Sequence, residues 1–474
     1  MKVHIRNIVI IGSIVLICLT VAITFAYMTG TDTNAPTYPT IDNAASVYEN
    51  AVNTLKHTDN ISLQITYKKE TLLENEYITE QSVQTISYQD RNSNTIKAKT
   101  AEKLTIGTHT ADIEEVFYKN QLYLNINGCL FRGNMATDAY LSRYTPAAPL
   151  SAALYNSVTG EDTGSGYNIY FSAPKQLEAW TAIDGAILRQ ANGTTHINAE
   201  GLLTRSIYTA SYNVDEINFR ISVTVEIDYN NIAPIQVPEQ NNAYVELTSP
   251  DAPRILEVAC GYLLDANGIL ATCNDEIICE AFGDRRNQKV TLRTNLDTAW
   301  SAQVDTEVEL INSSKAGSGS SYTQQEIFKE NTYSISIDGA HAIPNDHIDI
   351  NAMRSYCRDL LVGTIILPQY ITGAVITETE NTYLIEFTGN DTFAQVIDAE
   401  ACISLYQDGN VLKSTSQGYS VNTMNCSLEI SKDTGLPLRS GLYYQGIYTI
   451  DELPYPLTYQ TDHEYILLNE EAGA

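Results

Sequence analysis

The chain has little positive charge. Its 474 residues include 28 Lys and Arg against 57 Asp and Glu, which gives a formal net charge of −29. Such an excess of negative charge repels nucleic acid and anionic lipid headgroups, so we expect neither as a partner. The hydrophobic fraction of 43% provides enough apolar material for buried cores. The composition therefore predicts a folded chain, not a disordered one.

The sequence also lacks the short motifs that mark common catalytic centres. It contains no His-Glu-x-x-His motif, no Gly-x-Ser-x-Gly elbow, no phosphate-binding glycine-rich loop and no dinucleotide fingerprint. Acidic residues are so numerous that any two could be paired as a glycosidase dyad, which makes such pairing uninformative. We predict a protein that is not an enzyme, with no catalytic residue, no cofactor and no ligand-binding residue identified from the sequence.

One short segment contains several residues of the types that bind metal ions. Five such residues lie close together in the sequence: Asp338, His341, Asp346, His347 and Asp349. A metal site would need these side chains to converge, whereas a solvated loop needs nothing of them. Gly339 and Pro344 in the same segment favour a loop, so we predict no metal site.

An uncharged apolar run extends from Ile8 to Met28. About 20 helical residues cover the ~30 Å core of a bilayer. Because Lys2 and Arg6 precede the run, the positive-inside rule places residues 1–7 in the cytoplasm and the bulk of the chain outside the cell membrane. Small residues near its end leave cleavage of a signal peptide open. The run is longer than a usual signal core, so we predict a single-pass transmembrane anchor.

The eight cysteines are unevenly distributed. One lies in the apolar run, and Cys129 is the single cysteine of the first half outside it. The other six could form disulfides in an oxidising compartment, with the pairing left open: Cys260, Cys273, Cys279, Cys357, Cys402 and Cys426. Cys129 would then remain unpaired and buried.

The chain matches itself at several places in the same order. Residues 115–128 align with residues 326–339 and keep the apolar face of a period-two strand in register. Gly201 to Ser206 similarly align with Gly435 to Ser440. We therefore predict two related β-rich domains, which with the remaining segments divide the chain into a stalk 29–40, domain 41–232, linker 233–250 and domain 251–474.

A helix is predicted at the start of each domain. Ala44, Tyr48 and Leu55 follow the spacing of one helix face, with Asp42 placed to cap the N-terminus. In the second domain, Leu256, Ala259 and Leu263 form a similar stripe, while short helical patterns follow around residues 177–183 and 393–397. Alternating strands dominate the remainder, most clearly from residue 217 to residue 229.

This order of elements resembles the LolA-like and LppX-like superfamily. The resemblance rests on Gly435-Leu436-Pro437, on its partner Gly201-Leu202-Leu203, and on hairpin turns at Lys119-Asn120 and Glu330-Asn331. It covers most of residues 41–230 and 250–470. It implies a strongly curved, incomplete β-barrel whose concave face is closed by helices, a shape that in this superfamily carries lipids or lipoproteins or senses the state of the envelope.

The expected fold is therefore α+β and dominated by strands. A transmembrane helix precedes two tandem curved antiparallel sheets, or half-barrels, each with a packed N-terminal helix. The chain departs from the superfamily because its anchor is a helix and not a lipid, and because two units lie in tandem. A tethered protein cannot diffuse between membranes, so both departures argue against a shuttle function.

Two functions follow as hypotheses. In the first, the apolar inner face of one or both domains binds a lipid or another amphipathic ligand at the outer face of the membrane. In the second, the tandem domains form a structural or sensory envelope protein that engages a protein or cell-wall partner. An open cavity on a concave face would favour the first, and a face filled by helices would favour the second.

Overall fold

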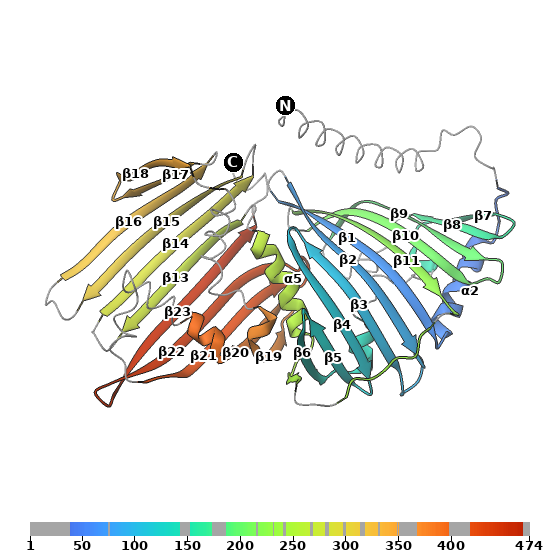
Figure 1. The fold of residues 1–474 in the computed structure, drawn as a ribbon. Coiled ribbons are helices and arrows are strands. Elements are labelled where there is room, and N and C mark those ends of the chain that lie inside the picture. Colours follow the sequence, from blue (N-terminus) through green and yellow to red (C-terminus); the bar gives the residue numbers. More distant parts are fainter. Residues whose placement is uncertain are drawn as a thin grey trace, which may run out of the picture.

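The computed structural model contains two large β-sheets, both twisted and bent (Figure 1). It describes residues 38–73, 76–142, 152–172, 186–214, 217–230, 232–239, 243–265, 269–279, 284–296, 300–312, 318–329, 332–347, 349, 367–397 and 418–467. The predicted anchor 8–28 and most of the stalk lie outside these ranges. Of the helices that are described, none has the length and apolar character needed to span a membrane.

The first sheet has twelve strands in the order β12-β6-β5-β4-β3-β2-β1-β11-β10-β9-β8-β7. Neighbouring strands run antiparallel, apart from β12, which lies parallel to β6. The strands are β1 (Ile61–Leu73), β2 (Glu76–Gln89), β3 (Lys97–Ile106), β4 (His109–Tyr118), β5 (Gln121–Ile126), β6 (Cys129–Asn134), β7 (Val158–Asp162), β8 (Gly166–Ser172), β9 (Ile187–Asn198), β10 (Leu203–Val214), β11 (Ile217–Asp228) and β12 (Val245–Glu246).

The second sheet has eleven strands in the order β18-β17-β16-β15-β14-β13-β23-β22-β21-β20-β19. They are β13 (Ile269–Cys279), β14 (Asp284–Leu296), β15 (Trp300–Asn312), β16 (Ser318–Lys329), β17 (Thr332–Ile337), β18 (Ala340–His347), β19 (Ile371–Glu378), β20 (Thr382–Gly389), β21 (Gly418–Ser431), β22 (Pro437–Ile450) and β23 (Leu453–Leu467). Strands β13 to β18 take the places of β1 to β6, and β19 to β23 those of β7 to β11. The two sheets thus share one strand order, as expected for two related units.

Tight turns join the long strands. Lys119 and Asn120 both have positive φ, 49° and 60°, between β4 and β5. Two consecutive residues with positive φ make the type I′ turn that matches the twist of a hairpin. The predicted turn at Lys119-Asn120 is confirmed, whereas that at Glu330-Asn331 lies outside the described residues.

Helix α2 (Ala44–His57) packs on the first sheet. Its predicted stripe is buried, including Tyr48 and Leu55. The prediction of Asp42 as N-cap is wrong, because the N-cap is Asn43 and its side chain makes no capping hydrogen bond. The backbone just before the helix instead bonds to β7, where the Ile41 amide donates to the Gly160 carbonyl at 3.0 Å. The Asp162 amide similarly donates to the Pro39 carbonyl at 2.9 Å, so the end of the predicted stalk lies against the sheet.

Short helical segments complete the described structure. They are α3 (Thr137–Ser142), the 3₁₀ turns η2 (Ala152–Leu154) and η3 (Pro368–Tyr370), and residues 391–397. The last segment confirms the helical pattern predicted near residues 393–397. The corresponding pattern at residues 177–183 lies outside the described chain.

Helix α5 (Ala252–Asp265) lies between the two sheets (Figure 1). Its predicted stripe of Leu256, Ala259 and Leu263 is buried. The helix contacts β19 and β22 of the second sheet and also β3 and β4 of the first. We call the face of each sheet that contacts a helix its inner face. At Gly261, a Cβ atom would stand 2.8 Å from the Ile106 side chain on the inner face of the first sheet, so a larger residue there would force that side chain to shift.

Charged groups hold α5 against the first sheet. Arg254 donates to both carboxylate oxygens of Glu102, at 2.9 Å and 3.2 Å, and Glu257 pairs with His109 Nε2 at 2.7 Å. Burial tends to raise the pKa of Glu102, but the Arg254 charge and hydrogen bonds from Ser82 and Gln84 outweigh it and hold that pKa below its ordinary value. Arg254 of the helix thus supplies the positive charge that balances the buried Glu102 carboxylate.

A lysine from the first sheet reaches into the second unit. Lys69 Nζ donates to the Thr434 carbonyl at 2.7 Å and lies 3.8 Å from Glu80. Its ammonium also lies over the rings of Phe219 and Tyr262, at 5.3 Å and 5.7 Å from their centroids. Burial lowers the pKa of Lys69 and the Glu80 charge opposes that shift. The two units therefore share one packed interface.

The predicted linker 233–250 is packed along the structure. Its strand β12 pairs with β6, the Leu247 amide donates to the Arg132 carbonyl at 2.8 Å, and the Ser249 amide donates to the Ala374 carbonyl at 3.2 Å. These residues fill the seam between the edge of the first sheet and β19. A sheet edge with unpaired amides favours such pairing over a free linker.

The segment predicted as a loop around His341 and His347 is strand β18, so that prediction is wrong. Strand β18 is at the edge of the sheet, where Pro344 removes no hydrogen bond between two central strands. Among the described residues, no three His, Cys, Asp or Glu side chains lie close enough together to hold a metal ion.

Replacing Arg254 by Ala should lower the free energy of unfolding by about 3 kcal/mol, because it leaves the buried Glu102 carboxylate without its counter-charge. Chemical denaturation measures this change. The matched control is Arg205→Ala, whose ion pair with Glu226 has both side chains 54% exposed and should cost less than about 1 kcal/mol. Equal losses for the two variants would show that α5 is not held by this pair.

Candidate ligand-binding face

The inner face of the first sheet is closed by the chain's own helices. Tyr140 of α3 stacks on Phe117 with ring centroids 4.4 Å apart. The ring centroid of Tyr48 on α2 lies 6.0 Å from that of Phe171. Another part of the face, at β3 and β4, is covered by α5, which packs on Leu104 and Ile106. These side chains are almost completely buried.

The repeated glycine motif aligns the two sheets residue by residue. Gly201 and Gly435 both have positive φ, 79° and 73°, in the turns before β10 and β22. Five residues after each glycine is a serine on the inner face. Ser206 is opposite Val225 in β11, and Ser440 is opposite His463 in β23. His463 therefore occupies the position of Val225.

The same register relates two further pairs of positions. Next to Val225, Val223 of β11 is opposite Tyr67 of β1, and at the equivalent place Thr461 of β23 is opposite Asp275 of β13. The first sheet thus has Tyr67, Val223 and Val225 where the second has Asp275, Thr461 and His463. We call the latter three residues the polar triad.

Each member of the polar triad carries a buried polar atom without a hydrogen bond. These atoms are Asp275 Oδ1, Thr461 Oγ1 and His463 Nδ1. Thr461 is fully buried and His463 is 3% exposed. A buried polar group without a partner costs about 1–3 kcal/mol, so three of them side by side require an explanation.

A short relay of hydrogen bonds reaches the carboxylate of the triad. Gln288 Nε2 donates to Asp275 Oδ2 at 3.2 Å, and Arg286 Nε donates to Gln288 Oε1 at 3.1 Å. Burial raises the pKa of Asp275, with Thr461, Arg286 and Gln288 acting in the opposite direction. One carboxylate oxygen is thus held in place, while the Thr461 hydroxyl lies near the carboxylate without forming a full hydrogen bond to the other oxygen.

The histidine of the triad lies in an apolar setting. Its ring is parallel to that of Tyr465, with centroids 6.1 Å apart, and the Tyr465 hydroxyl is 2.6 Å from Ser440 Oγ. Burial lowers the pKa of His463 to about 4, so the imidazole is neutral at physiological pH. Its Nδ1 can act as donor or acceptor, depending on the tautomer.

The inner face becomes more accessible away from the triad. The row that contains Asp275 continues across β14 and β15 to β16, through Gln288, Val308 and Tyr322. Gln288 and Tyr322 are half-buried, in contrast to Thr461, whereas Val308 between them is 3% exposed.

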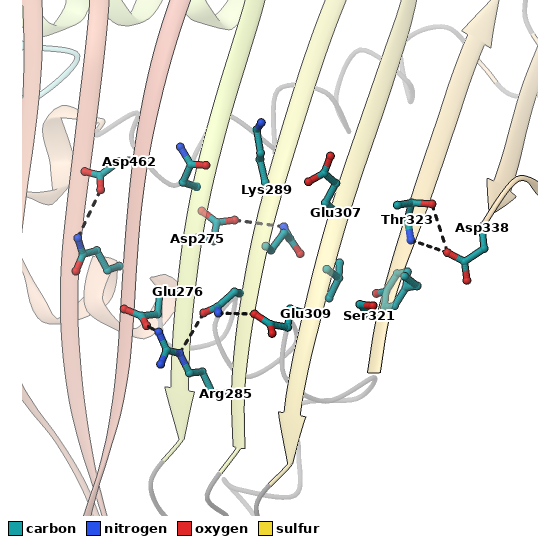
Figure 2. Close-up of a pocket in the computed structure, with 16 residues that line it drawn as sticks. Asp275, Glu276, Arg285, Lys289, Glu307, Glu309, Ser321, Thr323, Asp338 and Asp462 are labelled. Atoms are coloured by element: carbon teal, nitrogen blue, oxygen red, sulfur yellow. Dashed lines mark hydrogen bonds and ion pairs between the residues drawn. The ribbon is translucent and has the colours of Figure 1, made fainter. Parts of the chain in front are cut away.

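A hollow is lined mainly by side chains of the opposite, outer face of the same strands, and Asp275 is also part of its lining (Figure 2). It has a volume of about 690 Å³. Residues that line it hydrogen-bond to one another. Asn287 donates to Glu309, and the Thr323 amide donates to Asp338. A similar outer hollow of about 630 Å³ on the first sheet includes Arg205 and Glu226.

The sequence prediction named no ligand-binding residue, and the polar triad was missed. No sequence pattern located it, because ungapped alignment from Gly201 and Gly435 places Thr461 opposite Ile227 and His463 opposite Tyr229. Only the strand pairing matches these two residues with Val223 and Val225. The predicted pairing of all six second-half cysteines is also wrong, since Cys273 and Cys426 are buried free thiols. Cys129 is only partly buried.

Comparisons with known proteins give a likeness of fold only. No protein-family model and no curated protein matches the chain. LprF from Mycobacterium bovis is 14% identical over 43% of this chain and 99% of its own, with a TM-score of 0.26. The MucA/MucB complex structure from Pseudomonas aeruginosa is 8% identical over 90% and 94%, with a TM-score of 0.21. At these identities and TM-scores, neither a family nor a ligand follows from the likeness.

The low pKa of His463 predicts a specific acid sensitivity. The unfolded chain binds a proton at this residue near its ordinary pKa of 6.5, but the folded chain only near 4. Stability should therefore fall as the pH drops, by about 2–3 kcal/mol between pH 7 and pH 4.5.

His463→Asn should remove this contribution, so its unfolding free energy should fall less over that range than that of the original chain. The raised pKa of Asp275 acts with the opposite sign, stabilising the fold as the pH drops, and is common to both proteins. Parallel pH profiles from chemical denaturation would contradict the assignment of a buried neutral imidazole.

Proposed function

We propose that the chain is a non-catalytic, membrane-anchored extracytoplasmic protein that binds an amphipathic ligand on the inner face of its second sheet. Residues 8–28 would anchor it and hold the binding face near the outer leaflet. The first unit would serve as a support, because α5 and the other helices already cover its inner face.

The observation that carries the proposal is the contrast between the two inner faces. At equivalent positions the first sheet is apolar or aromatic, whereas the second has three adjacent polar atoms that are buried and without hydrogen bonds. A fold selected only for stability gains nothing from this change, since each such atom costs free energy. A ligand that supplies the missing hydrogen bonds explains it.

The surroundings of the triad suit an amphiphile. Leu442 and Cys426 continue its row towards β21, and Val290 lies next to Cys273 on β14. All of these side chains are buried. A polar group at the triad would therefore be flanked by apolar surface that can pack against hydrocarbon.

The direct test is extraction of the full chain, purified from its own host in detergent, followed by mass spectrometry. We expect one amphiphile at close to one molecule per chain, well above the background of bulk membrane lipid. Thr461→Trp, which fills the inner face, should lose it. Tyr443→Trp should retain it, because Tyr443 is on the outer face of β22 and 37% exposed.

Circular dichroism of both variants verifies that each is folded. Absence of an enriched amphiphile from the original chain would contradict ligand binding and favour a structural or sensory protein with a protein or cell-wall partner. Equal retention by the two tryptophan variants would place the ligand somewhere other than the inner face.

A further inference from the structure

We infer that the polar triad recognises an uncharged, hydroxyl-bearing head group of the amphiphile, with Asp275, Thr461 and His463 as its hydrogen-bonding residues. The inference rests on the proposed function and adds the chemistry of the ligand. It follows from the arrangement of the three side chains, from the charges around them and from their donors and acceptors.

The three side chains form one small patch. Asp275 is directly opposite Thr461 on neighbouring antiparallel strands, which places their Cβ atoms about 5 Å apart. His463 follows Thr461 by two residues on β23, about 7 Å along the strand and on the same face. A head group with two or three neighbouring oxygens can reach all three polar atoms at once.

The charges around the patch favour a neutral head group. Burial raises the pKa of Asp275 and the positive charge of Arg286 opposes that rise, so an ionised Asp275 has a counter-charge nearby, while His463 is neutral. An anionic head group would leave a buried excess of negative charge, and a cationic one a buried excess of positive charge. Either excess costs several kcal/mol in a desolvated site, whereas an uncharged group avoids it.

The donors and acceptors of the patch match hydroxyl groups. Asp275 Oδ1 accepts when ionised, Thr461 Oγ1 both donates and accepts, and His463 Nδ1 does either according to its tautomer. A hydroxyl group also donates and accepts. One hydroxyl can donate to Asp275 while accepting from Thr461, and a neighbouring hydroxyl or ester oxygen can satisfy His463.

The first sheet provides an internal contrast. At the equivalent positions, Val223 and Val225 offer no hydrogen bond, and the Tyr67 side chain is part of the aromatic and apolar core. The polar residues are thus a property of the second unit and not of the common strand arrangement.

The test compares two probes that differ in one group. Dioleoylglycerol has a free hydroxyl, and dioleoylphosphatidic acid carries a phosphate in its place on the same acyl chains. Binding of each radiolabelled probe to the full chain is measured in mixed detergent micelles. We expect dioleoylglycerol to bind at least about 10-fold more tightly, since one buried unpaired charge costs more than 1.4 kcal/mol.

Thr461→Val should weaken dioleoylglycerol binding about 3- to 10-fold, through loss of one hydrogen bond to the ligand. Without a ligand the same variant should melt at an equal or higher temperature, because it removes a buried hydroxyl that has no hydrogen bond. A merely structural role for Thr461 predicts the reverse. Thr458→Val, on the outer face of the same strand, is the matched control and should leave both quantities unchanged.

Asp275→Asn removes the charge that balances Arg286 and should therefore improve binding of dioleoylphosphatidic acid relative to dioleoylglycerol. Equal or tighter binding of dioleoylphosphatidic acid by the original chain would overturn the neutral head group and leave the proposed function intact. An unchanged affinity for dioleoylglycerol in Thr461→Val would overturn the role of the triad. Binding of neither probe, together with no amphiphile in the extract, would overturn the proposed function itself.

Discussion

The burial of α5 on two sides is the constraint on which the rest of the structure depends. Its apolar stripe belongs to the second unit, and its opposite side supplies Arg254, Glu257 and Tyr262 to the first. Neither sheet has a complete core without this helix. Because the helix completes both cores, the two units form one body, and the segment before the helix pairs with the edges of both sheets.

The shared helix α5 also gives the inner faces of the two units different roles. Residues of α5 donate hydrogen bonds to the carboxylates of Glu102 and Glu80 on the inner face of the first sheet, so that face is an intramolecular interface. In the second unit, the inner face around Asp275 and Thr461 retains polar atoms that no described residue satisfies. Tandem units with one strand order can thus carry different chemistry, because a few inward positions can change while the hydrogen-bonded ladder stays the same.

Much of the fold was predictable because strand and helix patterns are local. The alternation from residue 217 onwards, the stripe of Tyr48 and Leu55 and the turn at Lys119-Asn120 all form as expected. The failures lie where pairing partners distant in sequence decided the outcome. Residues 340–347 became a strand despite Pro344, since an edge strand tolerates proline, and residues 243–250 joined a sheet edge.

The sequence by itself determined the period of each strand, the two helix faces and the repetition of the glycine turns, because these depend on neighbours a few residues apart. Only the tertiary structure decided that Arg254 and Glu257 face a sheet and not water. It likewise decided that Asp275, Thr461 and His463 meet at one place, almost 190 residues apart in the chain. Strand pairing between β13 and β23 creates that contact, and no local pattern encodes which distant strands will pair.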